Sequence, residues 1–166
     1  RQMCIRDRNY LVLTGDGSEE TEEKLGYYGE RIVLKAQALG LNSCWVAATY
    51  SKGACRKACG LEKDEKLACA IALGYGETQG VPHESKPLTE LFELCSAAGK
   101  APEWFVKGVE AAALAPTALN RQNFNIVLLE DGRVRLEKQG ACAALDLGIV
   151  RYHFEQGAGK ENFEWA

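Results

Sequence analysis

A chain of 166 residues can form one domain with a sizeable core, and 46% hydrophobic with 26% charged residues is ordinary for a soluble globular protein. The net charge of -3 and the pI near 5.5 argue against nucleic acid or an anionic membrane surface as the main partner. No apolar run approaches the length of a membrane span and the N-terminus has no signal core. We therefore expect no membrane partner and a cytoplasmic location.

The cysteines favour a reducing compartment. Their number, 7, is odd, and no secretory context supports disulfides, so we expect reduced, mostly buried thiols. Cys55 and Cys59 are four residues apart, but there is no second pair and the histidines, His83 and His153, are distant. A structural zinc site is therefore not expected.

The first eight residues, RQMCIRDR, resemble the translation of a transposon end that is used to tag DNA in sequencing libraries. We expect residues 1–8 to be a non-native leader from metagenomic sequencing, although a natural, unusual leader is the alternative. On this reading, the rest is a fragment that lacks roughly seventy to eighty residues at its N-terminus.

From Asn9 onward the pattern alternates between short strands and helices. A strand is predicted over 10–14, a helix that Ser18 or Asp16 caps and Gly40-Leu41-Asn42 ends, and a strand or extended loop over 43–49. A short helix near 52–59 and a central strand over 67–73 follow. By pattern alone, the stretch 26–49 is a core helix that leads into a core strand.

The glycines after the strand 67–73 do not favour a dinucleotide site, because Gly74, Gly76 and Gly80 have the spacing G-x-G-x-x-x-G and Val81-Pro82 follows them. A helix is predicted over 86–96 and a linker over 97–100. The remaining predictions are a helix from Pro102 to before Pro116, a hairpin at Asp131-Gly132 and a helix over 145–156.

Three segments resemble the FMN-dependent nitroreductases. The run A-x-A-L-G-L-N-S-C-W-V within residues 32–48 resembles their L-x-A-x-x-L-G-L-G-T-C-W segment. Residues 74–90 are similar to G-Y-P…K-x-R-x-P-L-x-E, and residues 115–122 to A-P-S-x-x-N-x-Q-P-W. The resemblance covers nearly everything from Asn9 to Trp165.

The resemblance implies a set of cofactor-binding residues. In the family, the residues after the tryptophan lie against the flavin ring, the basic residue before the proline helps to hold the FMN phosphate, and the A-P-S-x-x-N motif touches the flavin. The alternatives are a solvated loop lysine at position 86 and an ordinary capping loop at 117–120. The expected cofactor-binding residues are Trp45, Val46, Ala47, Ala48, His83, Ser85, Lys86, Pro116, Thr117 and Asn120.

The fold implied by the resemblance is α+β and nitroreductase-like, with an antiparallel-rich mixed sheet flanked by helices. The match is to single-chain members in which two fused units imitate the usual homodimer. Residues 9–100 would be the C-terminal part of the first unit and residues 101–166 a compressed second unit. One FMN site per chain, shared between the units, is expected, in a monomer or a weak homodimer.

The function implied is an oxidoreductase that passes electrons from NAD(P)H through FMN to nitroaromatic or quinone-type acceptors. No acid, base or nucleophile of the protein is then required, so we expect no catalytic side chain. The arginine-serine-arginine segment with which family members begin has no counterpart here, so we expect weakened flavin binding. Other acceptors, or a flavin-binding or storage protein of the same fold, are the alternatives.

Overall fold

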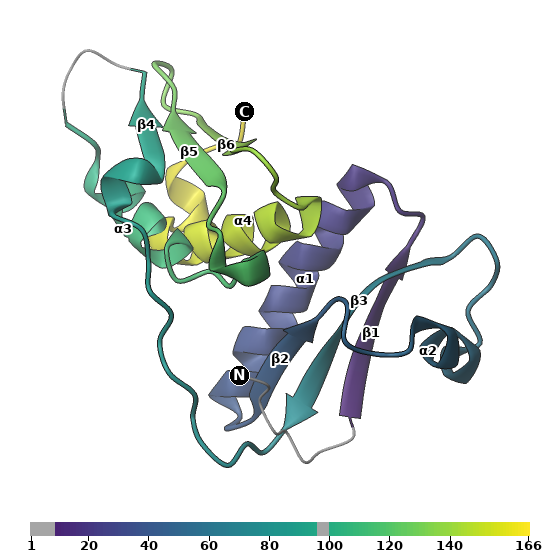
Figure 1. The fold of residues 1–166 in the computed structure, drawn as a ribbon. Helices are drawn as coiled ribbons and strands as arrows, with labels where there is room; N and C mark the ends of the chain where they lie inside the picture. Colours follow the sequence, from purple (N-terminus) through teal and green to yellow (C-terminus); the bar gives the residue numbers. More distant parts are fainter. Residues whose placement is uncertain (1–8, 96–99) are drawn as a thin grey trace. The chain divides into compact units, whose positions relative to one another are not determined.

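The computed structural model describes residues 9–95 and 100–166 (Figure 1). The leader predicted for residues 1–8 and residues 97–99 of the predicted linker lie outside the described residues. The chain divides into two compact units, and the boundary along the chain lies between Val81 and Pro82. Each unit has its own three-stranded sheet. The assignment of residues 9–100 and 101–166 to two nitroreductase-like units stays a prediction.

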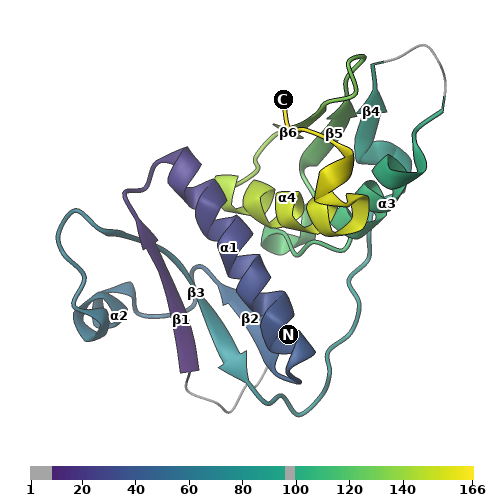
Figure 2. The same cartoon turned by 180° about the vertical axis from the view of Figure 1, so that it is seen from behind.

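The first unit combines an antiparallel sheet with one long helix (Figure 2). The strand order is β1-β3-β2, so β3 is the central strand, as the sequence predicts. The register pairs Leu13 with Cys69 on one side and Trp45 with Ile71 on the other. The elements are β1 (Asn9–Gly15), α1 (Glu19–Ala38), β2 (Asn42–Val46), α2 (Lys52–Cys59) and β3 (Lys66–Gly74).

Helix α1 begins and ends where the sequence predicts. The Ser18 hydroxyl accepts a hydrogen bond from the backbone N–H of Thr21 at 3.2 Å, which caps the first turn. Acidic residues occupy that turn, where the helix dipole favours negative charge. The helix ends at Leu39, and Gly40 follows with a φ of 80°, a left-handed conformation that glycine adopts without a steric cost.

The contact of α1 with the sheet depends on a glycine. A Cβ atom at Gly29 would lie 2.4 Å from Cη2 of Trp45 and 3.1 Å from Cδ1 of Leu13. Side chains of β2 and β1 therefore pack directly on the helix backbone. Val33 and Ala36 continue the buried face of the helix. The core of the first unit lies between this face and the strands.

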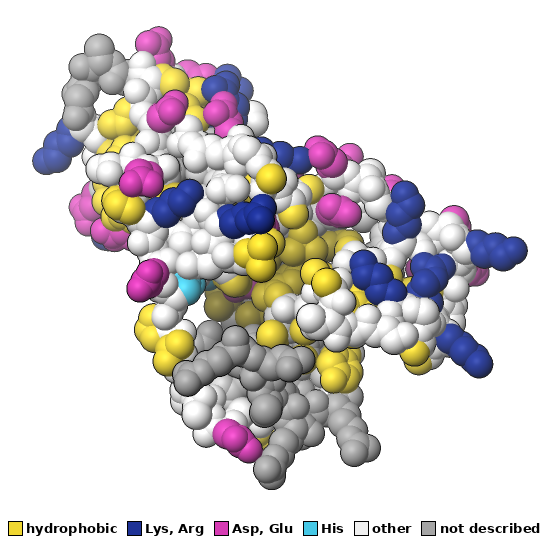
Figure 3. All heavy atoms as spheres, in the orientation of Figure 1, with side chains coloured by type: hydrophobic (Ala, Val, Ile, Leu, Met, Phe, Trp, Pro, Cys, Tyr) yellow, Lys and Arg dark blue, Asp and Glu magenta, His cyan; other side chains and the backbone are white. Residues whose placement is uncertain are grey.

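Helix α2 and the loop after it form an exposed, partly basic region of the first unit. Ser51 caps α2, and Gly60 ends it in a left-handed conformation with a φ of 64°. The Arg56 guanidinium donates to the carbonyl oxygens of Glu62 and Glu65, which closes the loop. Figure 3 shows dark blue side chains gathered over this region.

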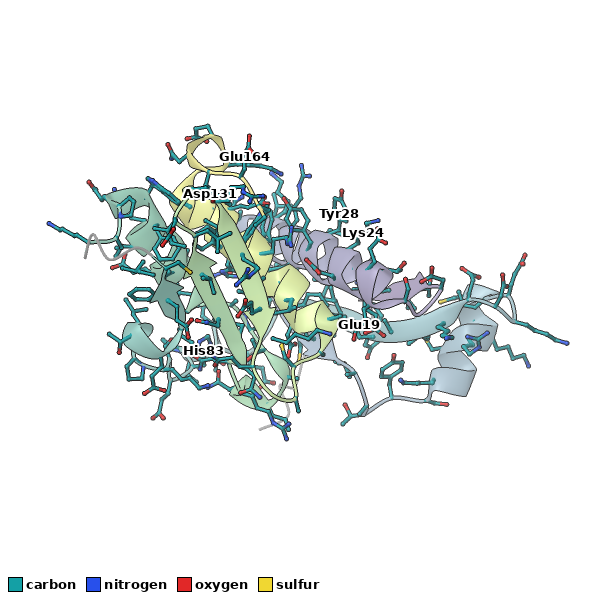
Figure 4. The ribbon with its side chains drawn as sticks, turned by 90° about the horizontal axis from the view of Figure 1, so that it is seen from above. Glu19, Lys24, Tyr28, His83, Asp131 and Glu164 are labelled. Carbon is teal, nitrogen blue, oxygen red and sulfur yellow. The ribbon has the colours of Figure 1, made fainter. Side chains whose placement is uncertain are left out.

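The second unit combines a mixed sheet with two main helices. Strand β5 is central in the order β4-β5-β6, parallel to β4 and antiparallel to β6. The β5–β6 hairpin confirms the turn predicted at Asp131-Gly132; Figure 4 labels Asp131. The elements are η1 (Leu88–Glu90), β4 (Phe92–Leu94), α3 (Glu103–Ala112), η2 (Ala118–Asn120), β5 (Phe124–Leu128), β6 (Val134–Lys138), α4 (Ala144–Ala158) and η3 (Lys160–Asn162).

The helix predicted over residues 86–96 is wrong. Its described part, residues 86–95, instead forms the short turn η1 and the strand β4, and Ser96 lies outside the described residues. Leu91 is completely buried, and its carbonyl oxygen accepts from the backbone N–H of Ile126 at 2.9 Å. Strand pairing with β5 therefore overrides the helical spacing of Leu88, Leu91 and Phe92.

The core of the second unit is aromatic. Phe105 of α3 and Phe154 of α4 are both completely buried, with ring centroids 5.8 Å apart. A Cβ at Gly108 would lie 2.5 Å from the Phe154 ring, so the two helices approach closely at this glycine. The C-terminal residues add to the sheet edge, because the N–H of Val134 donates to the Glu164 carbonyl and the N–H of Ala166 to that of Val134.

The α+β class with helices flanking largely antiparallel strands is confirmed, although the strands form two small sheets. The expectation of mostly buried cysteines is wrong: of the six described, Cys69 alone is buried. Within residues 9–95 and 100–166, none of the helices combines the length and the apolar character needed to cross a membrane.

Candidate functional site

Two segments of the second unit that carry expected cofactor-binding residues lie against each other. One is the extended segment 82–87 that precedes η1, which includes His83 (labelled in Figure 4). The other is the loop 116–122 between α3 and β5. Hydrogen bonds connect the two segments across 36 to 38 residues of chain.

Gln122 is the centre of these connections. Its side chain is 2% exposed, and its Nε2 donates to the Glu84 carbonyl at 2.9 Å and to Oδ1 of Asn120 at 3.1 Å. Its Oε1 accepts from the backbone N–H of Lys86 at 2.9 Å. Because a buried amide needs partners for both its donor and its acceptor atoms, these bonds fix the two segments together.

Lys86 is attached to the same residue at both ends. Its Nζ donates to the backbone carbonyl of Gln122 at 3.1 Å, so the half-buried side chain lies along the loop rather than in solvent. An ammonium group has three N–H bonds, and this contact uses one of them. Lys86 therefore combines a fixed position with donors that remain for an anionic ligand.

His83 and Ser85 both contact the end of α3. The Ala113 carbonyl oxygen lies 3.0 Å from Nε2 of His83 and accepts from the Ser85 hydroxyl at 2.9 Å. The Ser85 Oγ is also 3.3 Å from Nε2 of His83. A carbonyl oxygen only accepts, so Nε2 of His83 must carry the hydrogen in this contact. The donor groups of both side chains are thus directed at the protein's own backbone.

The loop 116–122 has an unusual backbone. Leu119, Asn120 and Gln122 have φ values of 57°, 54° and 49°, in a left-handed region that non-glycine residues seldom occupy. The Thr117 hydroxyl accepts from the Gln122 N–H at 3.0 Å, and Nδ2 of Asn120 donates to the Glu84 carbonyl at 2.9 Å. Pro116, half-buried, precedes them. Strained conformations of this kind persist where the surrounding contacts hold them.

Asp146 of α4 contacts the backbone of the loop 116–122. Both of its carboxylate oxygens lie 3.2 Å from the backbone nitrogen of Ala118. Its side chain is buried, and burial raises its pKa above the usual value of 3.8, an effect that the bond from Ala118 partly opposes. The ionised form of Asp146 is therefore unfavourable in this buried position, and the N–H of Ala118 partly compensates its charge.

The other expected site residues lie in the first unit. Trp45 and Val46 are the last two residues of β2, and Ala47 and Ala48 are exposed in the bend that follows. The indole Nε1 of Trp45 donates to Oε2 of Glu30 at 3.0 Å. Ala47 and Ala48 are therefore accessible from solvent, whereas the indole N–H of Trp45 donates inside the unit.

Sequence reasoning missed Gln122, Asp146 and Glu30 as positioning groups. Gln122 belongs to the motif-like segment 115–122, but its burial, like that of Asp146, depends on partners distant in sequence. Glu30 was detectable as an acidic residue four positions from Gly26 and one from Gly29, on the apolar side of the helix. In residues 9–95 and 100–166, no group of three or more His, Cys, Asp or Glu side chains is arranged to hold a metal ion.

A family model described as "Putative TM nitroreductase" matches residues 1–158. A solved structure of a Thermotoga maritima protein with the description "putative nitroreductase" matches with a TM-score of 0.72 and 27% identity. The match covers 93% of this chain and 63% of that one, so the chain spans less than two thirds of that protein.

A second solved structure, an FMN-dependent nitroreductase from Clostridium difficile, is 21% identical. That match covers 43% of this chain and 47% of the other, with a TM-score of 0.37. No curated protein matches the chain.

Proposed function

The chain belongs to the family described as "Putative TM nitroreductase". On that premise we propose that the protein carrying this chain is an FMN-dependent reductase. The electron donor would be NAD(P)H and the acceptors nitroaromatic or quinone-type compounds. The membership supports an oxidoreductase of nitroreductase type, and the finer assignments of cofactor, donor and acceptor are the proposal.

One observation carries the proposal. The segments 82–87 and 116–122, which resemble two separate nitroreductase motifs, are joined through the buried side chain of Gln122. A chance resemblance in two loops gives no reason for them to share one fixed hydrogen-bond network. The network keeps Lys86 in place beside the strained loop that carries Thr117 and Asn120.

The residues present fit a phosphate-bearing ligand at Lys86. The ammonium group is half-buried and holds one carbonyl contact, so it can still donate to a phosphate oxygen. His83 and Ser85 donate to the Ala113 carbonyl, and we propose that they position the segment before Lys86. Pro116, Thr117 and Asn120 would shape the ligand-facing side of the loop.

In the first unit, the proposed role of Trp45 to Ala48 is to offer backbone groups to a flavin ring. Ala47 and Ala48 are exposed and have small side chains, so a planar ligand can approach their backbone. Bound FMN would accept a hydride from NAD(P)H and pass the two electrons on to the acceptor. The protein's own work is to bind and orient, and no side chain is required to exchange a proton.

Titration of the protein that carries this sequence with FMN and riboflavin tests the proposal. Flavin fluorescence and absorbance report binding, and we expect saturable binding of FMN that is tighter than that of riboflavin, because riboflavin lacks the phosphate. Absence of saturable binding of either flavin would contradict the proposed cofactor.

A further inference from the structure

We infer that Glu30 is a positioning residue of the flavin site: it fixes the indole of Trp45 and, through Trp45, the backbone of Val46 to Ala48. The identity of the ligand rests on the proposed function. The positions of Glu30, Trp45 and residues 46–48 rest on contacts inside the first unit, whichever ligand binds.

Glu30 is a buried acid in the middle of a helix that faces the sheet. Its side chain is 1% exposed, and its Oε2 accepts from Nε1 of Trp45 at 3.0 Å. Burial of a carboxylate is unfavourable unless hydrogen bonds satisfy its oxygens. An apolar side chain at this position would fill the space without that cost. The acid therefore contributes something that packing alone does not, a fixed partner for the indole N–H.

Gly29, the residue before Glu30, allows the indole ring of Trp45 to lie close to the helix backbone. A Cβ atom at Gly29 would lie 2.4 Å from Cη2 and 3.2 Å from Cζ2 of Trp45. These atoms belong to the same edge of the indole as Nε1. That edge is thus held by the helix backbone at Gly29 and by the carboxylate at Glu30. Because an indole has a single N–H, this pair of contacts defines the orientation of the ring.

The orientation of Trp45 bears directly on the exposed bend. The register between β2 and β3 ends with Trp45 opposite Ile71 and Val46 opposite Ala70. Ala47 and Ala48 follow without a strand partner in that register and are exposed. Trp45 is therefore the last large anchored side chain before the backbone groups that are proposed to meet the flavin. If Trp45 loses its hydrogen bond to Glu30, we expect the backbone of residues 46–48 to become mobile before the rest of the sheet does.

The test uses three variants and a control. Glu30→Leu removes the acceptor, and Trp45→Phe removes the donor while it keeps an aromatic ring over Gly29. Glu30→Gln retains an oxygen acceptor and should rescue the contact. Glu20→Leu is the matched control, because Glu20 is an exposed acid on the same helix that pairs with Lys24. If Glu30→Leu does not fold, Trp45→Phe carries the same comparison.

Amide hydrogen exchange of residues 46–49 is measured without ligand, and FMN affinity and the reduction potential of bound FMN are measured on folded protein. We expect faster exchange at 46–49 in Glu30→Leu and Trp45→Phe, and FMN affinity lower by on the order of tenfold, as for the loss of one positioning hydrogen bond. The potential should shift as well, which a loss of stability alone would not produce. Glu30→Gln and Glu20→Leu should resemble the wild type.

Unchanged exchange at 46–49 together with unchanged flavin affinity and potential, in variants that are merely less stable, would overturn the inference. A wild-type protein that binds no FMN contradicts the proposed function instead. In that case the exchange data alone decide whether Glu30 fixes residues 46–48, because they require no ligand.

Discussion

Nε2 of Gln122 donates to the backbone carbonyl of Glu84 at 2.9 Å, across a sequence separation of 38 residues. The same side chain accepts from the backbone N–H of Lys86, two residues further on. One buried amide thus fixes the peptide groups on both sides of Ser85. The position of Lys86, the cation proposed to meet a phosphate, follows from a residue in a different loop.

Replacement of Gln122 by Leu should destabilise the second unit. The substitution keeps the volume but removes every side-chain hydrogen bond, and it leaves the Lys86 N–H and the Glu84 carbonyl with fewer partners. We expect a loss of about 2–4 kcal/mol in the free energy of unfolding. Urea denaturation measures it, with Arg121→Leu as the control because Arg121 is exposed. A loss no larger than that of the control would show that the network is not important for stability.

Replacement of Lys86 by Ala should weaken FMN more than riboflavin. A charge-assisted hydrogen bond contributes about 1.5 to 3 kcal/mol, which corresponds to a ten- to a hundredfold change in affinity. Lys107→Ala serves as the control, since Lys107 pairs with Glu103 on an exposed face of α3. Flavin titration of both variants gives the result. Equal losses for the two flavins would remove Lys86 from the phosphate site.

Asn120 combines a strained backbone with two side-chain hydrogen bonds, and two substitutions separate these effects. Asn120→Gly removes the bonds to Glu84 and Gln122 but tolerates the φ of 54°, whereas Asn120→Ala also introduces strain. Ala should be less stable than Gly by about 1 kcal/mol. Thermal unfolding compares the two. Both should weaken FMN if Asn120 shapes the ligand-facing side of the loop, and unchanged affinity in both would exclude it from the site.

Asp146 should make stability depend on pH in the acid range. Burial raises its pKa in the folded protein, so the folded state binds the proton more tightly than the unfolded state does. The contribution of Asp146 to the free energy of unfolding therefore rises as the pH falls toward its unfolded pKa, near 3.8. Above its folded pKa the ionised group costs stability.

Asp146→Asn removes this titration and keeps an oxygen for the Ala118 N–H. Relative to the wild type, the variant should gain stability as the pH rises from below 3.8 to neutral. Denaturation of both proteins across that range measures the difference. A difference that is constant with pH, or that changes in the opposite direction, would contradict the raised pKa.

Local signals in the sequence predicted most of the elements. Ser18 and Gly40 marked the ends of α1, and Asp131-Gly132 marked the β5–β6 hairpin, because capping and turn chemistry act over a few residues. The failure at residues 86–96 has a tertiary cause. Leu91 is buried beside β5, and pairing with a strand more than thirty residues later decided the local structure.

The candidate site was predictable only where it depends on local sequence. Motif resemblance selected Lys86 and Asn120, since single residue types recur at fixed spacing in a family. Their hydrogen-bond partners were not predictable, because Gln122 and Asp146 act on backbone groups brought near only by folding. The network also changes the interpretation of His83 and Ser85, whose donors meet the Ala113 carbonyl.

Anaerobic reduction of the flavin-loaded protein tests the central claim most directly. The protein that carries this sequence is saturated with FMN, and the yellow absorbance is followed while NADH or NADPH is added, and then a nitroaromatic or a quinone. We predict that one of the nucleotides bleaches the absorbance and that the acceptor restores it, with one FMN per chain. Bound FMN that neither nucleotide reduces would contradict the account and would indicate a flavin-binding protein without reductase activity.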